Sequence, residues 1–415
     1  MDLTTVNGQI AGTAIGDTCV TGKNETGAPN NQAFQDDCNL IVGGATTDSP
    51  DASAQALTDL AADQINAQNS AAGRATRVSV ALVQNRLERI RIAGGSPTYQ
   101  PGAALAANSL FRGQTGGAAS GDVAFGRFGG FLNADYVTGD EDTTDFQPGY
   151  DYDAWSVVGG IDYRFADNFF GGLSLRYADG DVDFDSNRGS MSGDAWGLSA
   201  YGSYFLPSGL FFDGLIGYGV SDYTLKRRIQ YSIDGIDANQ TAKSDPDADL
   251  WNFNLGAGYT INREAWSFTP ELRINYLQNK LDGYSERMSD PKGVGGSMGL
   301  AIDSQTYESL TSNLGIQIAR AISHAHGVIV PQLRLGWIHE FKNDQESVGA
   351  RFVNDINNTP LFVLTNKPDR DYIDLAIGVS AQFAQGKSGF ISYNTLLDYD
   401  GVSYNAFSAG VRVEF

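Results

Sequence analysis

Residues 251–261 read Trp-Asn-Phe-Asn-Leu-Gly-Ala-Gly-Tyr-Thr-Ile, and their alternation indicates the fold most clearly. Side chains of a β-strand point alternately to its two faces, so one face is apolar and the other polar. The apolar face carries Trp251, Phe253, Leu255, Ala257, Tyr259 and Ile261, and the opposite face carries Asn252, Asn254, Gly256, Gly258 and Thr260. A tilted strand needs about 9–11 residues to cross a bilayer, and this segment has that length.

The same alternation recurs in residues 155–165, 268–276 and 373–383. A soluble β-sandwich alternates too and is the alternative interpretation. The polar faces, however, carry Gly, Ser, Asn and opposite charges, and aromatic residues gather at both ends of the strands, as in a membrane barrel with two interfaces. One aromatic set is Phe165, Phe169, Phe170, Phe205, Phe211, Phe212, Trp266, Phe268 and Phe383, and the other is Tyr136, Tyr150, Tyr152, Trp155, Tyr177, Trp196 and Trp251.

Tight turns and longer loops alternate along residues 116–415. The tight turns are expected at 165–169, 206–209, 262–265, 323–327 and 385–387, and the loops at about 138–150, 179–194, 222–249, 281–304, 342–370 and 398–402. Five turns and six loops join 12 strands. We therefore predict an all-β transmembrane fold, a 12-stranded antiparallel up-and-down β-barrel.

The composition of the 415-residue chain excludes several classes of protein. With 28 Lys and Arg against 49 Asp and Glu, the net charge is −21, which repels nucleic acid phosphates. The 22 Phe, 19 Tyr and 5 Trp are too many for a disordered chain. No run of about 18 apolar residues predicts a transmembrane helix.

Residues 1–48 form a polar segment rich in Gly, Asn, Thr and Asp, in which we expect loops. Its Cys19 and Cys38 suit a disulfide formed outside the cytoplasm, and two free thiols are the alternative. Met1-Asp2-Leu3 shows no secretory signal. We expect an exported protein whose signal is not part of this sequence.

Ser49-Pro50-Asp51 has the pattern of a helix start, and we predict a helical linker or plug over 49–93, followed by a Gly/Ala-rich linker over 94–115. Five arginines are spread around more than half of the expected helix: Arg74, Arg77, Arg86, Arg89 and Arg91. This distribution suits a helix inside a charged tunnel. A basic helix exposed in the periplasm is the alternative.

Three segments resemble the β-domain of autotransporters, the type V secretion family: YDYDAWSVVGGIDYRFADNFFGGLSLRY (150–177), DAWGLSAYGSYFLPSGLFFDGLIGYG (194–219) and FSAGVRVEF (407–415). The resemblance implies a 12-stranded barrel in the bacterial outer membrane, with an N-terminal α-helix in the lumen and few passenger residues ahead of it. The final strand, through Ser408, Gly410, Val413 and Phe415, resembles the signal read by the barrel-assembly machinery.

The expected function is export or display of the chain's own N-terminal segment, by a monomer in contact with outer-membrane lipid and lipopolysaccharide. A plugged or gated diffusion channel and a surface adhesin acting through the long loops are the alternatives. The side chains expected to line the lumen and hold the helix arginines are Asp162, Arg164, Arg176, Asp213, Glu271, Arg273, Arg334, Asp374, Arg412 and Glu414.

No enzyme chemistry and no cofactor are expected. Gly295-Gly296-Ser297-Met298-Gly299 matches the G-x-S-x-G pattern, but it lies in a Gly-rich loop with no histidine nearby. The pair His324 and His326 lacks a third metal ligand. Acidic loops could bind Ca²⁺ or Mg²⁺ loosely, with a weak candidate site at Asp179, Asp181, Asp183 and Asp185, although a solvated acidic rim is the simpler interpretation.

Overall fold

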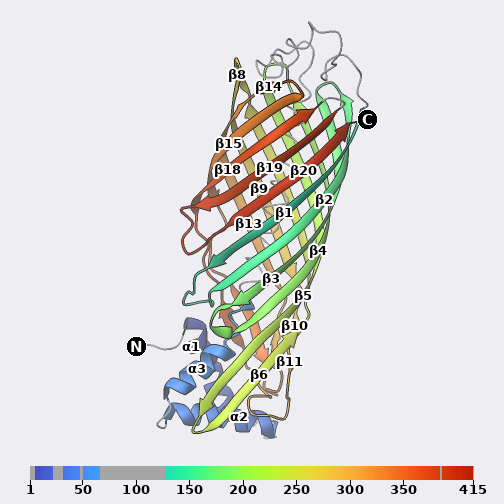
Figure 1. Cartoon of the computed structure of the whole chain (residues 1–415). Helices are drawn as coiled ribbons and strands as arrows, with labels where there is room; N and C mark the ends of the chain where they lie inside the picture. Colours follow the sequence, from blue (N-terminus) through green and yellow to red (C-terminus); the bar gives the residue numbers. More distant parts are fainter. Residues whose placement is uncertain (1–4, 22–30, 47–49, 66–126, 384–385, 415) are drawn as a thin grey trace.

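The computed structural model describes residues 5–21, 31–46, 50–65, 127–383 and 386–414, and twelve of its strands close into an antiparallel barrel (Figure 1). The last strand pairs with the first, from Gly129 opposite Glu414 to Thr138 opposite Asn405. The predicted strand number and topology are confirmed. The barrel strands are β1 (Phe128–Glu141), β2 (Tyr150–Ala166), β3 (Phe169–Phe184), β4 (Gly189–Phe205), β5 (Leu210–Ile233), β7 (Asp247–Tyr259), β9 (Trp266–Leu281), β13 (Gln305–Arg320), β15 (Gly327–Glu340), β18 (Asp371–Phe383), β19 (Lys387–Leu397) and β20 (Asn405–Glu414).

The tight turns lie at one end of the barrel, called here the turn end, with the short strands β8 (Ile261–Arg263) and β14 (Ile322–His324). At the other end, the loop end, two predicted loops are wrong. Residues 179–194 are mostly strand, with β3 and β4 joined through the single turn η1 (Asp185–Asn187). Residues 222–249 continue β5 into a hairpin with β6 (Ile236–Ser244). Both stretches are rich in charged residues, yet they still alternate. In β3, Val182 and Phe184 point inward and Asp181 and Asp183 point outward.

Further short strands lie within the predicted loops 281–304 and 342–370. They are β10 (Tyr284–Ser285), β11 (Arg287–Met288), β12 (Leu300–Ile302), β16 (Ser347–Phe352) and β17 (Leu361–Leu364). β11 pairs with β6, and the other four form a small second sheet in the order β10-β12-β16-β17. The long β5–β6 hairpin and this small sheet form a wall that projects beyond the barrel at the loop end, called here the extension.

The outer face of the barrel is apolar, and most of the predicted aromatic residues lie on it, such as Trp155, Trp196 and Trp266. Five assignments are wrong, because Phe170, Phe205, Phe211, Tyr150 and Tyr152 are inward-facing and wholly or partly buried. Several inward aromatic rings lie over glycines of a neighbouring strand, where a side chain would collide with them. The pairs are Phe131 over Gly160, Tyr201 over Gly172, Phe211 over Gly258 and Phe390 over Gly410.

The N-terminal segment is helical, which corrects the loops expected over residues 1–48. It contains α1 (Val6–Thr21), α2 (Gln32–Thr46) and α3 (Pro50–Leu60). The buried residues of α2 recur with the period of a helix. Asp37 and Gly44 lie on the buried face beside Phe34 and Ile41, so the sequence shows no continuous apolar stripe there. No helix of the described ranges is long and apolar enough to cross a membrane.

The predicted helix over 49–93 begins as expected, since α3 starts at Pro50. It breaks early, at Ala62, whose φ of 54° is left-handed and incompatible with a continuing α-helix. Residues 66–126 lie outside the described residues, and with them the rest of that helix and the linker. The barrel domain expected from 116 begins, in its described part, at Arg127.

Candidate functional site

The three helices pack against the inner side of the extension at the loop end, and they are called here the cap (residues 5–65, in the described ranges). Cap and extension share one apolar core, in which Phe34 of α2 lies 5.5 Å from the ring of Phe352 on β16. Gly44 touches Ile233 so closely that a side chain would not fit there. Cys19 of α1 and Cys38 of α2 are joined by a disulfide, which links the two helices inside this core.

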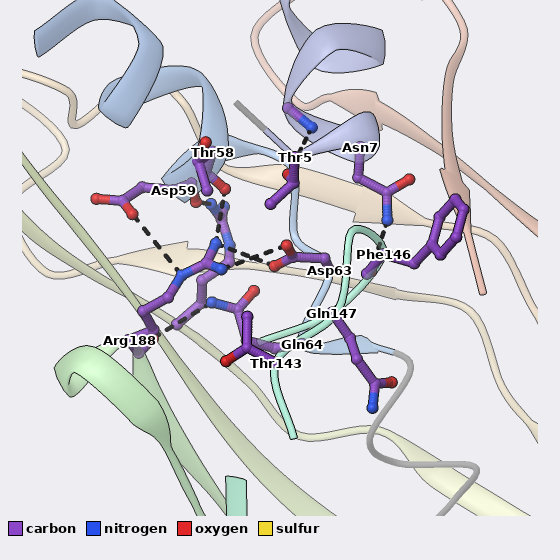
Figure 2. A network of polar contacts seen from close by, with 12 residues as sticks. Thr5, Asn7, Thr58, Asp59, Asp63, Gln64, Thr143, Phe146, Gln147 and Arg188 are labelled. Atoms are coloured by element: carbon purple, nitrogen blue, oxygen red, sulfur yellow. Dashed lines mark hydrogen bonds and ion pairs between the residues drawn. The ribbon is translucent and has the colours of Figure 1, made fainter. Parts of the chain in front are cut away.

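Arg188, at the β3–β4 turn, is the main polar contact between barrel and cap (Figure 2). Its Nη2 lies 3.0 Å from Asp63 Oδ1, and its Nη1 donates to Asp63 Oδ2 at 3.3 Å. Nη2 also donates to the Thr58 carbonyl oxygen at 2.7 Å, and Nε lies 3.8 Å from Asp59 Oδ1. One guanidinium therefore contacts the Thr58 carbonyl oxygen in the last turn of α3, the Asp59 carboxylate in the same turn and the Asp63 carboxylate just beyond it.

Both carboxylates lie away from water. Asp63 is fully buried and Asp59 is 4% exposed. Burial raises the pKa of Asp63, and the charge of Arg188 opposes this rise. Burial also raises the pKa of Asp59, against the hydrogen bond from the Gln230 amide and the charge of Arg188. The positive charge thus compensates only part of the cost of desolvation.

A second buried arginine, Arg227 on β5, joins the cap to the small sheet. Its guanidinium forms an ion pair with Glu286, with Nε donating to Oε1 at 2.8 Å. Its Nη1 donates to the Asp59 carbonyl oxygen at 2.8 Å. Glu286 in turn accepts the Leu300 amide at 2.9 Å. Barrel, small sheet and cap therefore meet at this one pair.

The Gly-rich loop with the G-x-S-x-G pattern holds a carboxylate. Asp37 of α2 accepts the Gly295 amide at 2.7 Å, the Ser297 amide at 3.2 Å and the Ser297 hydroxyl at 2.5 Å. Ser297 is 2% exposed. The small residues let the backbone amides converge on the carboxylate, as in an anion-binding nest. In this structure the serine serves as a hydrogen-bond donor to the cap.

At the start of α1, the side-chain amide of Asn7 forms the hydrogen bonds to β17 that a neighbouring strand would form. Its side-chain carbonyl accepts the Leu364 amide of β17 at 2.7 Å, and its Nδ2 donates to the Leu364 carbonyl at 2.9 Å. The same Nδ2 donates to the Phe146 carbonyl at 2.8 Å. One amide side chain thus satisfies the edge of β17, which sheets otherwise leave open.

The barrel wall carries its own ion pairs on the inner face. Arg273 lies 2.8 Å from Glu271 and 3.3 Å from Asp213, Arg334 lies 3.4 Å from Asp374, and Arg412 lies 3.5 Å from Asp162 and also contacts Glu414. Arg176 interacts electrostatically with Asp135, and Arg164 is half-buried on β2. A cavity of about 330 Å³, lined in part by Arg273, Arg334 and Asp374, occupies the lumen.

The structure thus groups eight of the ten predicted wall residues: Arg273 with Glu271 and Asp213, Arg412 with Asp162 and Glu414, and Arg334 with Asp374. The five helix arginines, from Arg74 to Arg91, lie outside the described residues, so their contact with the wall stays a prediction. Ser408, Gly410 and Val413 lie on β20 at the closing seam, and Phe415 lies outside the described residues.

The metal candidates lie on the barrel strands and their turns. Asp179, Asp181 and Asp183 lie on β3, where Asp181 and Asp183 are exposed, and Asp185 belongs to η1. Within the described ranges, no group of three or more His, Cys, Asp and Glu is arranged to hold a metal ion. His324 and His326 lie at the turn end, and the rings of the two are 5.7 Å apart.

Sequence reasoning missed the residues that hold the cap, above all Arg188, Arg227, Asp37, Asp59 and Asp63. A signal was present, because residues 1–65 carry nine acidic residues and a single basic one, Lys23. A segment of this kind that buries any acid needs a cation or amide from elsewhere. Which barrel residue supplies it depends on the tertiary structure.

Residues 130–394 match the family model for the autotransporter β-domain. The BrkA autotransporter of Bordetella pertussis is 26% identical over 266 residues, which are 63% of this chain and 23% of that protein. An uncharacterised protein from the trpE–trpG intergenic region of Pseudomonas putida is 27% identical over 143 residues, 33% of this chain and 21% of that protein. The chain therefore spans less than a quarter of the length of these relatives.

The fold is similar to that of the translocator domain of the autotransporter NalP from Neisseria meningitidis. The TM-score is 0.56 at 14% sequence identity, over 82% of this chain and 98% of the other. At this identity the likeness concerns the fold.

Proposed function

Because the chain belongs to the autotransporter β-domain family and is a translocator barrel of the bacterial outer membrane, we propose that it exports its own N-terminal segment and displays it as a cap. The observation that carries this proposal is the position of the cap. It packs at the loop end, whereas β1 begins with Phe128 beside the turn end.

In outer-membrane barrels the short turns face the periplasm and the longer loops face the outside. By this rule the cap lies outside the cell and the start of β1 lies on the periplasmic side. On export, the segment that forms the cap has to cross from the periplasmic side to the outer side. An unpaired backbone is not stable in lipid, so the lumen is the favoured route.

The position of the cap also weighs against the diffusion-channel alternative, in which the N-terminal segment would plug the barrel from the periplasm. We propose two further sets of partners for the barrel. Lipid and lipopolysaccharide contact its outer face, and the barrel-assembly machinery recognises β20. We propose no catalytic role, since the hydroxyl of Ser297, the candidate nucleophile, is engaged by Asp37.

The experiment is antibody labelling of intact cells that carry an epitope at Asp2. An epitope in the β5–β6 turn at Asp234–Gly235 serves as the external control, and one in the turn at 206–209 serves as the periplasmic control. We expect Asp2 and the external control to be labelled without permeabilisation. Labelling of Asp2 only after the outer membrane is opened would reject export and favour the plugged channel.

A further inference from the structure

The cap depends on the barrel and the extension for the groups that compensate its buried carboxylates. It buries three carboxylates, those of Asp37, Asp59 and Asp63, each less than 8% exposed. The sequences of α1, α2 and α3 contain no Lys, Arg or His. Apart from the Gln55 amide, which donates to Asp59 at 2.9 Å, the contacts described above that satisfy these carboxylates come from barrel or extension.

The groups that receive the three carboxylates belong to the barrel and the extension. Arg188 stands on a turn between two barrel strands, the Gln230 amide belongs to β5, and the Gly295 and Ser297 donors lie in the loop before β12. The turn that holds Arg188 also contacts the extension, since the Arg228 amide of β5 donates to the Arg188 carbonyl oxygen at 2.9 Å. These groups are called here the carboxylate receptors.

The apolar core of the cap is also completed by residues of the extension. Its helices have 16, 15 and 11 residues, a length at which isolated helices are marginal in water. The cap contributes Phe34, Ile41 and Leu60 to a buried cluster that also contains Ile229, Ile233 and Phe352 of the extension. A single disulfide joins α1 to α2 but leaves α3 unlinked.

We propose that the extension is the folding template of the exported segment, whose helices are stable only while the carboxylate receptors hold Asp37, Asp59 and Asp63. This rests on the proposed function, because the segment meets the extension only after it has crossed the barrel. The partner that the template recognises is an acidic, helix-forming segment, supplied by the same chain. Removing a receptor leaves buried carboxylates uncompensated, and the cap unfolds as it detaches.

The test is hydrogen exchange, measured by mass spectrometry on the full chain in lipid. In Arg188→Met, the amides of α1, α2 and α3 are expected to exchange at least about tenfold faster than in the parent chain. Arg287→Met is the matched control, because Arg287 lies on β11, which pairs with β6 of the extension, and it is exposed and pairs with Asp245. It should leave the cap unchanged.

A rescue variant separates the template from general damage to the barrel. In Arg188→Met combined with Asp59→Asn and Asp63→Asn, no buried charge remains without a partner, and exchange should slow by roughly tenfold relative to the single variant. Retained protection of α1–α3 in the double variant Arg188→Met, Ser297→Ala would mean that the segment folds without the template. The proposal would then be rejected.

Labelling of the Asp2 epitope on intact cells distinguishes this proposal from the proposed function. We expect Arg188→Met to keep the epitope outside while the helices lose protection. A parent chain whose epitope is periplasmic would overturn export itself, whatever the exchange pattern. An epitope outside with exchange unaffected by Arg188→Met would overturn only the template.

Discussion

Arg188 of the barrel and Asp63 of the cap form a two-point ion pair across 125 positions of sequence, with contacts of 3.0 and 3.3 Å. Asp63 is fully buried and the Arg188 side chain is 10% exposed. A pair so shielded from water is costly to break, since either partner alone would be a buried, uncompensated charge. The attachment of the cap is therefore sensitive to changes at either end of this contact.

The first prediction concerns pH. The pKa values of Asp59 and Asp63 are raised in the folded state, so the docked cap binds protons more tightly than the detached one. This contribution to stability is fully present below the unfolded pKa of about 3.9 and is lost as the pH rises through the raised values. We expect cap amides, corrected for intrinsic rates, to be better protected near pH 4–5 than at pH 8.

Asp63→Asn should flatten this dependence, because it removes the group with the most completely buried carboxyl. Asp51→Asn, on the exposed first turn of α3, is the matched control and should leave the dependence in place. Protection that increases with pH in the parent chain would show that attraction by Arg188 outweighs desolvation.

The second prediction concerns Arg227. Arg227→Met leaves Glu286 buried without its cation and should lower the free energy of unfolding of the extension by about 3–5 kcal/mol. Adding Glu286→Gln should recover part of this loss. Arg351→Met is the control, since its pair with Asp303 is long, at 3.7 Å, and exposed, and such pairs contribute about 0–1 kcal/mol. Urea unfolding of the three variants provides the comparison, and equal losses in both single variants would contradict the assignment.

The third prediction concerns the closing seam. Gly410 on β20 lies beneath the Phe390 ring and beside the Asn133 amide, so a methyl group there would collide with both. Gly410→Ala should slow barrel assembly and lower the temperature at which the folded band disappears in heat-modifiability gels. Gly389→Ala, where a methyl group finds only ordinary contacts, should behave like the parent chain. Identical behaviour of the two variants would rule out this steric role.

The fourth prediction concerns Asn7. Asn7→Asp keeps the acceptor for the Leu364 amide but loses both donor contacts, to Leu364 and Phe146. We expect a loss of about 1–3 kcal/mol, since a carboxylate would face two carbonyl oxygens. Faster exchange at α1 and β17, with α2 and α3 affected less, would be the signature. Thr13→Ala, which removes a local and exposed hydrogen bond, is the control.

Residues 251–261 illustrate what alternation can predict. One apolar face, repeated along the chain and separated by turns, was enough for the strand count and the antiparallel order, and both are confirmed. The family was predicted from the resemblance of three segments, and it is confirmed as well. The reason is local: the period of two, the strand length and the turn residues are properties of neighbouring positions.

Residues near the ends of the strands were less predictable. Tyr150 and Phe211 were assigned to the aromatic belts, but both face inward. An aromatic ring near a barrel end can cover lipid or a glycine of the next strand, and only the register between strands decides which. The acidic stretch 179–194 reads as a loop in the sequence, because its charges hide the alternation of Val182 and Phe184.

The docking of the cap on the extension is decided by the tertiary structure. Asp37 and Asp63 look like solvated acids, and Ser297 looks like part of a catalytic pattern, until the fold brings them against the extension. Local patterns determine strands because a strand's two faces meet lipid and lumen wherever it lies. A buried carboxylate is stable only beside its donor, and here the donor lies more than a hundred residues away, at a place that only the closed barrel defines.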